Sequence, residues 1–161
     1  MPTEKGSRRG FRPRLRDKGD SHMVNPPSIT FTDWTRWVDR SRIGGLEKPG
    51  VYVLAHFAER PSTVDLQAQE IIYIGETCHQ SLRKRWAQFH QCAFEEKAGH
   101  SGGITYRRLY DGKSTEQLFV AAFPVDGLTE RLCPLFIRYV ERKLILRYAM
   151  KWDKAPDCNR K

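Results

Sequence analysis

The side chains with the clearest chemical potential are two tyrosines and a pair of arginines that follows them. Tyr52 ends a Gly-Val-Tyr run, Tyr73 begins a Tyr-Ile-Gly run, and Arg83 and Arg85 come next on a segment with helical apolar spacing. A guanidinium matches phosphate geometry and stabilises transition-state charge. A tyrosine with a lowered pKa can orient or deprotonate water. This set makes phosphodiester hydrolysis the leading hypothesis, although each residue alone could equally be structural.

Glu141 is the strongest single candidate. It falls in the middle of an apolar arc on a helix predicted over residues 134–151. A carboxylate among apolar neighbours is unfavourable unless it is paired or binds a metal. Glu141 could therefore coordinate Mg²⁺ (or Mn²⁺), since Mg²⁺ takes one or two carboxylates together with water and phosphate oxygens. The alternative is a buried salt bridge to Arg83, Arg85 or Arg138.

Three further polar residues are weaker candidates. His90 and His100 could take part in general acid–base catalysis, and His100 stands in a glycine-rich stretch over residues 99–103 that is expected to be a flexible loop. Asn159 could position a phosphate group or the backbone.

Periodicity of the apolar residues predicts the elements that position these side chains. The predicted strands cover residues 51–57, 70–76 and 118–125, and the predicted helices cover 81–97, capped by Ser81, and 134–151. A run over 104–110 is a weaker strand. The spacing of Trp34, Trp37 and Val38 predicts a short amphipathic helix within residues 28–42.

Strand alternation predicts which side chains share a face. Tyr52 and Leu54 should lie together on the first strand, and Tyr73 should share its face with Ile71 on the second. Pairing of the two strands as a hairpin would bring both tyrosines to the same side of the sheet. Gly75 is expected to allow a tight turn into the next helix.

The helix over residues 134–151 carries two apolar arcs, which predicts that it is largely buried. The first arc surrounds Glu141, and the second consists of Leu135, Tyr139, Leu146 and Met150.

Composition favours a polyanionic partner. The chain has 28 Lys and Arg against 19 Asp and Glu, a net charge of +9, which attracts nucleic acid. Residues 1–28 are rich in Arg, Gly and Pro and are expected to form a disordered basic arm, either a phosphate-scanning segment or a solvated tail or cloning remnant. Residues 29–161 have the length of one domain.

Other sequence features bear on location. No apolar stretch approaches the ~20 residues that cross a membrane, and the first twenty residues lack the apolar segment expected of a secretory signal. The four cysteines form no Cys-x-x-Cys pair, which is typical of reduced thiols in the cytoplasm.

The order of these motifs resembles the GIY-YIG nuclease superfamily over about Gly50 to Asn159. The run at Tyr52 is similar to the first name motif, with valine in place of isoleucine, and the run at Tyr73 matches the second. Leu82-Arg83-Lys84-Arg85-Trp86 resembles the arginine helix of the family and points to Arg85. Glu141 resembles its metal-binding glutamate, and Asn159 its closing asparagine.

The resemblance implies a fold and a reaction. The fold would be α/β in the α+β sense, a small, mostly antiparallel three-stranded sheet flanked by helices. Glu141 would hold Mg²⁺ (or Mn²⁺), Tyr52 with help from Tyr73 would deprotonate water, and Arg85 would stabilise the transition state. The products would carry a 5′ phosphate and a 3′ hydroxyl.

One position departs from the family. Many members have a histidine or tyrosine one helical turn after the arginine, where this chain has Phe89. His90 or His100 could substitute for it, or Tyr52 could act alone. Within residues 100–117, an expected DNA-contacting insertion, His100, Arg107 and Arg108 are candidate DNA contacts, as is Arg83 on the arginine helix.

The length leaves no room for a separate DNA-binding domain, which favours a compact type II restriction-like endonuclease in a restriction system. Cleavage of both strands would then require a homodimer, a larger oligomer or sequential nicking. Alternatives are a mobile-element, phage or repair nuclease, a catalytically silent DNA-binding module, or a structural domain with a solubilising basic tail.

Overall fold

A computed structural model describes residues 25–111, 113 and 115–159, and most of the basic arm predicted over residues 1–28 lies outside them. The fold is α+β, as predicted, with a four-stranded antiparallel sheet in the order β1-β4-β2-β3. The sequence indicated three strands. The strands are β1 (Thr35–Arg36), β2 (Gly50–His56), β3 (Ile71–Thr77) and β4 (Leu118–Pro124). The helices are α1 (Leu82–Phe94), α2 (Ser101–Tyr110) and α3 (Cys133–Trp152), with 3-10 turns η1 (Trp37–Arg42), η2 (Thr115–Gln117) and η3 (Asp157–Asn159).

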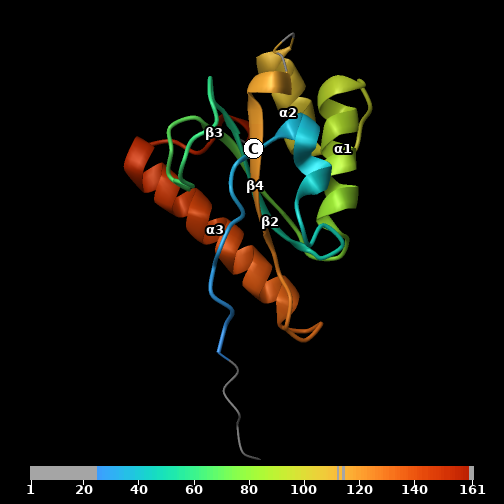
Figure 1. The fold of residues 1–161 in the computed structure, drawn as a ribbon, viewed down its shortest axis with the longest axis vertical. Helices are drawn as coiled ribbons and strands as arrows, with labels where there is room; N and C mark the ends of the chain where they lie inside the picture. The colour runs from blue at the N-terminus through green and yellow to red at the C-terminus, as the bar shows by residue number, and fades with distance from the viewer. Residues whose placement is uncertain (1–24, 112, 114, 160–161) are drawn as a thin grey trace, which may run out of the picture.

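The sheet separates two hydrophobic clusters. Helices α1 and α2 and the turn η1 cover one face, and α3 covers the other (Figure 1). Tyr52 and Leu54 of β2 point to the α1 side, while Val51 and Val53 point to α3. Strand β3 is an edge of the sheet, so one of its sides is free to border a site.

A β-bulge changes the predicted alternation on β3. Leu54 pairs with Tyr73 and Ala55 pairs with Ile71, so Ile72 has no partner. Ile72 therefore joins Tyr73 on the α1 side of the sheet. The prediction that Tyr73 shares its face with Ile71 is wrong. The predicted proximity of the tyrosines is confirmed, because the rings of Tyr52 and Tyr73 lie 5.9 Å apart between centroids.

The segment 28–42 is not the predicted amphipathic helix. Residues 25–34 are irregular, Thr35–Arg36 pairs with β4, and only Trp37–Arg42 is helical, as a 3-10 turn. Trp34 and Trp37 are both fully buried, but on opposite faces of the sheet. Apolar side chains three residues apart therefore do not always indicate a helix. Here the chain runs past the edge of the sheet, so Trp34 and Trp37 are buried on its two faces.

Residues 99–110 also differ from the prediction of a flexible loop and a weak strand. They form helix α2, with His100 as its N-cap. The glycines allow α2 to pack against α1: a Cβ on Gly103 would lie 2.7 Å from the Cβ of Cys92. Since glycine disfavours a helix by about 1 kcal/mol, the helix here depends on tertiary packing rather than on propensity.

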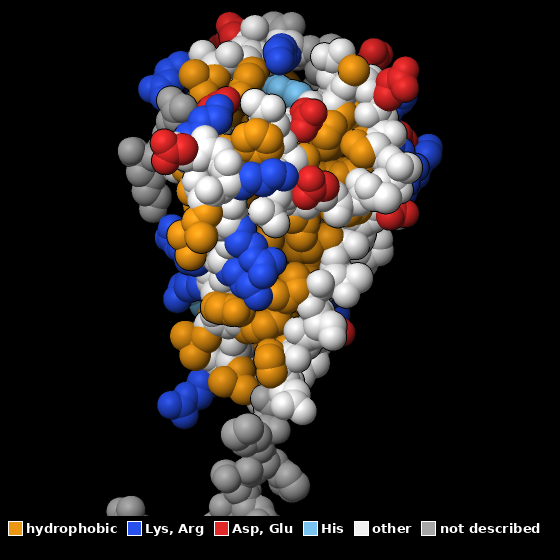
Figure 2. Space-filling view, turned by 90° about the vertical axis from the view of Figure 1, so that its left-hand side faces the viewer, with side chains coloured by type: hydrophobic (Ala, Val, Ile, Leu, Met, Phe, Trp, Pro, Cys, Tyr) orange, Lys and Arg blue, Asp and Glu red, His pale blue; other side chains and the backbone are white. Residues whose placement is uncertain are grey.

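Helix α1 ends at Phe94, earlier than predicted, and its predicted cap is confirmed because the Lys84 amide donates to Ser81 Oγ. Helix α3 closely matches the predicted span, but the prediction that it is largely buried is wrong. Its second apolar arc faces outward, with exposed fractions of 55–78%. The arc consists of Leu135, Tyr139, Leu146 and Met150. Figure 2 shows this side of the molecule, where hydrophobic and basic side chains share the lower half and acidic ones gather above.

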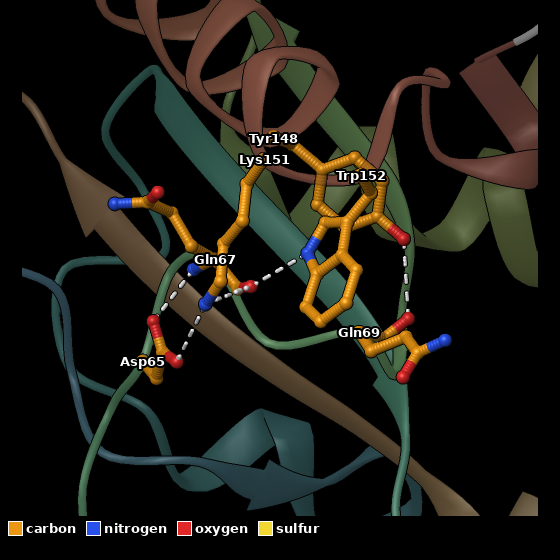
Figure 3. A network of polar contacts seen from close by, with 6 residues as sticks. All are labelled: Asp65, Gln67, Gln69, Tyr148, Lys151 and Trp152. Carbon is orange, nitrogen blue, oxygen red and sulfur yellow. Dashed lines mark hydrogen bonds and ion pairs between the residues drawn. The ribbon is translucent and has the colours of Figure 1, made fainter.

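The end of α3 is anchored to the loop between β2 and β3 (Figure 3). Trp152 Nε1 and Lys151 Nζ donate to the carbonyl of Gln67, and the Tyr148 hydroxyl donates to the carbonyl of Gln69. These bonds fix α3 against the strand that carries Tyr73. Among the described residues, no helix is long and apolar enough to cross a membrane.

Candidate active site

A cavity of about 410 Å³ opens at the free edge of β3, where elements from both faces of the sheet meet. Strand β3 contributes its floor, α1 and α2 one wall, and α3 the other. Four residues singled out from the sequence line it: Tyr73, Arg85, Glu141 and Asn159. The remaining lining residues are Glu76, Ser101, Thr105, Arg138, Arg142, Ile145 and Cys158.

Two glycines make room for the tyrosines. A Cβ on Gly75 would lie 2.7 Å from Cζ of Tyr52 and 2.6 Å from Cε1 of Tyr73. A Cβ on Gly102 would lie 2.6 Å from Cζ of Tyr73. Gly75 lies within β3 rather than at the expected turn into α1, so its role is space for two rings. Gly102 was not singled out from the sequence, since its contact is made across the fold.

Tyr73 and Tyr52 stand at different depths. Tyr73 lines the cavity, whereas Tyr52 is completely buried behind it. The Tyr52 hydroxyl lies 3.1 Å from Nε2 of His100, a buried side chain at the start of α2. His100 also contacts the rings of Phe89 and Tyr73. His100 thus approaches the tyrosines from the start of α2. Many members of the GIY-YIG superfamily have a histidine or tyrosine one helical turn after the arginine, where this chain has Phe89 of α1.

The hydrogen bonds of His100 define its tautomer. The Gly103 amide donates to Nδ1 over 3.1 Å, so this nitrogen carries a lone pair. Burial and the nearby charge of Arg85 lower the pKa of His100 to about 3, so the ring is neutral. Its single proton is then on Nε2, which donates to the Tyr52 oxygen. Tyr52 must direct its own proton elsewhere, and the adjacent Tyr73 oxygen can accept it.

The pKa shifts of the tyrosines agree with a hydrogen bond in which Tyr52 donates and Tyr73 accepts. Burial raises the pKa of both phenols, and Arg85 partly offsets the rise in each. The hydrogen bond between the two phenols lowers the pKa of Tyr73 and raises that of Tyr52. Of the two, Tyr73 is therefore the phenol whose anion is better stabilised and the one that faces the cavity.

Arg85 brings a positive charge to the cavity, which its side chain lines. Its side chain hydrogen-bonds to Tyr52 and Tyr73, while its Nε is buried and has no partner within the described part of the chain. A guanidinium at this position can bind an anion in the cavity. Arg83 points elsewhere, because its Nε binds Glu47 over 2.6 Å on the exposed surface.

Glu141 is accessible from the cavity. Its side chain is 14% exposed, and one carboxylate oxygen lies 3.4 Å from Nε of Arg142. Glu76 lines the same cavity and adds a second carboxylate. No group of three or more His, Cys, Asp and Glu side chains gathers as a metal site among the described residues. One or two carboxylates nevertheless suit Mg²⁺, which takes its other ligands from water and phosphate.

Asn159 binds the backbone of the edge strand. Its Oδ1 accepts from the Ile74 amide over 2.8 Å, and its Nδ2 donates to the Ile74 carbonyl over 2.7 Å. The side chain thus takes the place of a neighbouring strand and satisfies the free edge of β3. Ile74 lies between Tyr73 and Gly75, so this contact holds the tyrosine strand in position.

The structure does not bring the other candidates into the cavity. His90 accepts a hydrogen bond from Trp37 on the far flank of α1. Arg107 lies on another side of α2, with a buried, unpartnered terminal nitrogen. Arg108 is exposed and follows Thr105 by three residues, so it extends the helix face that lines the cavity.

Comparisons of the chain with protein-family models, with curated proteins and with solved structures gave no significant match. The GIY-YIG resemblance therefore rests on the motif residues of the sequence.

Proposed function

We propose that the chain is a metal-dependent DNA endonuclease of the GIY-YIG type. The observation that carries the proposal is the convergence of Tyr73, Arg85 and Glu141 on one cavity, with Tyr52 and His100 directly behind. These residues come from β3, α1, α3, β2 and α2. Three of them combine a base, a cation and a metal-binding carboxylate, which is the set that phosphodiester hydrolysis requires.

In this proposal Tyr73, and not Tyr52 as the sequence suggested, is the group that touches water. Tyr73 faces the cavity; burial raises its pKa, and the charge of Arg85 and the hydrogen bond from Tyr52, which is itself bonded to His100, partly offset that rise. The Tyr73 phenolate accepts a proton from water as the water oxygen attacks phosphorus. The bond from phosphorus to the 3′ oxygen breaks, and that oxygen takes a proton from solvent. Tyr52 and His100 are positioning residues.

Arg85 supplies the electrostatic part of the proposal. Its guanidinium, which lines the cavity, donates to a phosphate oxygen on which charge increases in the transition state. A donor fixed before the reaction needs no reorganisation when that charge develops. Glu141, with Glu76 in the same cavity, would hold Mg²⁺ or Mn²⁺. A cation bound there would neutralise charge on the phosphate and on the leaving oxygen.

The direct test is incubation of supercoiled plasmid and genomic DNA with the purified protein in Mg²⁺, beside EDTA. Glu141→Ala is the test variant. Glu47→Ala is the matched control, because Glu47 is an exposed carboxylate that pairs with Arg83. We expect cleavage that EDTA and Glu141→Ala abolish and Glu47→Ala retains. Full activity of Glu141→Ala would contradict the assignment of the metal ligand.

The cleavage pattern separates the biological alternatives. Discrete fragments would indicate a type II restriction-like enzyme, with a homodimer or sequential nicking acting on the two strands. Nicks or smears would favour a mobile-element, phage or repair nuclease. A catalytically silent DNA-binding module is the second candidate, favoured by the ion pair between Glu141 and Arg142. It predicts salt-sensitive DNA binding without cleavage.

A further inference from the structure

A second cavity adjoins the candidate active site. It has a volume of about 380 Å³ and shares Glu76, Arg85 and Arg138 with the first. Its other lining residues continue from the end of β3 through the connection to α1: Thr77, Cys78, His79, Gln80 and Lys84. The two cavities therefore form one open path along the free edge of the sheet.

Two cations on opposite walls of the second cavity have no carboxylate partner. Lys84 projects from α1 and Arg138 from α3, both are exposed, and neither forms a salt bridge within the described part of the chain. Their neighbours differ: Arg83 pairs with Glu47, and Arg142 pairs with Glu141. Among the residues that the structure describes, Glu76 alone lines this cavity with a carboxylate, which accepts a hydrogen bond from the Cys78 thiol.

The backbone at the start of α1 does not supply the site. The amides of Leu82 and Arg83 donate to the carbonyls of Lys48 and Leu46, and the Lys84 amide donates to Ser81. The positive character of the second cavity therefore comes from side chains. Two cations from different helices that line one open cavity without a salt bridge suit a phosphate on a flexible chain.

We propose that the second cavity binds the phosphate next to the scissile one on the same DNA strand, between Lys84 and Arg138. The inference rests on the proposed function, because it takes Arg85 as the ligand of the scissile phosphate. Nucleic acid presents phosphates in series, so a strand with one phosphate at Arg85 carries its neighbours out along an open path. Arg138 borders both cavities and Lys84 only the second, so the strand leaves the active site past Lys84.

The test measures binding of a labelled DNA duplex in EDTA, over a range of salt concentrations. The variants are Lys84→Gln, Arg138→Gln and the double variant. The matched controls are Lys97→Gln and Arg60→Gln, which remove the same charge at residues paired with Glu95 and Asp33 and border neither cavity. All four positions are exposed, so we expect every variant to fold.

Loss of this one phosphate contact in the double variant should lower the slope of log K against log salt by about 0.9, and each single variant should lower it by less. Between 50 and 200 mM salt, a slope change of about 0.9 reduces the salt dependence of affinity by about 3.5-fold. The controls should leave the slope close to that of the native protein. A double variant whose slope equals that of the controls would overturn the proposal, as would a native protein that binds no DNA.

The binding and cleavage measurements fail independently. A native protein that cuts DNA, with a slope that Lys84 and Arg138 do not affect, retains the nuclease and loses the second phosphate site. A native protein that does not cut DNA, with a slope lowered by both substitutions, retains the site and loses the nuclease.

Discussion

Gly75→Ala tests the packing of the two tyrosines most directly. The added Cβ would lie 2.7 Å from Cζ of Tyr52 and 2.6 Å from Cε1 of Tyr73, where ordinary contact begins at 3.4 Å. The Tyr52 ring must therefore move away from the added Cβ by about 0.7 Å, and the Tyr73 ring by about 0.8 Å. Tyr73 cannot retreat toward α2, because it already packs closely over Gly102. The substitution must displace the proposed base from its position in the cavity.

The expected effect is large on activity and smaller on stability. A displacement of about 1 Å in a catalytic geometry can reduce the rate by about 10²-fold. Overpacking of a core position destabilises by about 1–3 kcal/mol. We therefore expect Gly75→Ala to remain folded at low temperature and to cleave plasmid about one hundred times more slowly. Plasmid cleavage at saturating DNA and urea unfolding followed by circular dichroism measure the two effects.

Gly44→Ala is the matched control, since a Cβ there meets nothing within 4 Å. Gly102→Ala is a second test, because its Cβ would push only Tyr73 while alanine favours the helix by about 1 kcal/mol. It should also lose activity and remain folded. Cleavage by both Gly75→Ala and Gly102→Ala within about threefold of the native rate, set against the ~10²-fold loss expected, would refute the argument.

Four further predictions follow from named contacts. Asn159→Ala leaves the Ile74 amide and carbonyl without partners and should lower the free energy of unfolding by about 1–3 kcal/mol, with the exposed Asn25→Ala as an unchanged control in urea unfolding. His100 has its pKa lowered to about 3 and His56 to about 4, both from 6.5, so the unfolded state binds protons first as pH falls. The free energy of unfolding should therefore be highest above pH 6.5 and should fall as the pH is lowered toward 4. The fall should be less steep in His100→Gln, and unfolding experiments at a series of pH values measure it. Leu144→Ala should destabilise by about 2–5 kcal/mol and Leu146→Ala by less than about 0.5 kcal/mol, because α3 buries the first and exposes the second; equal losses in a thermal melt would contradict this register. Burial raises the pKa of Tyr73 above 10, so the cleavage rate should rise with pH through the neutral range, and Tyr73→Phe should remove that rise in a pH–rate profile.

Local patterns determined much of the fold. Strands β2 and β4, helices α1 and α3, and the common face of the two tyrosines follow from alternation and helical spacing. These signals come from which side chains must be buried, and that information lies within each segment. The order of the motifs and their resemblance to the GIY-YIG superfamily, rather than the local patterns, predicted that Tyr73, Arg85 and Glu141 belong to one site.

Only the tertiary structure decided the features that depend on contacts between distant segments. The bulge at Ile72, the helix at Ser101–Tyr110 and the outward face of α3 each depend on how another element packs. His100 is the clearest case, because its position beside Tyr52 requires α2 to pack closely on α1 through Gly103. Asn159 binds Ile74, which lies 85 positions away in the chain. Tyr73 lines the cavity and Tyr52 lies behind it, and no local pattern encodes this difference in depth.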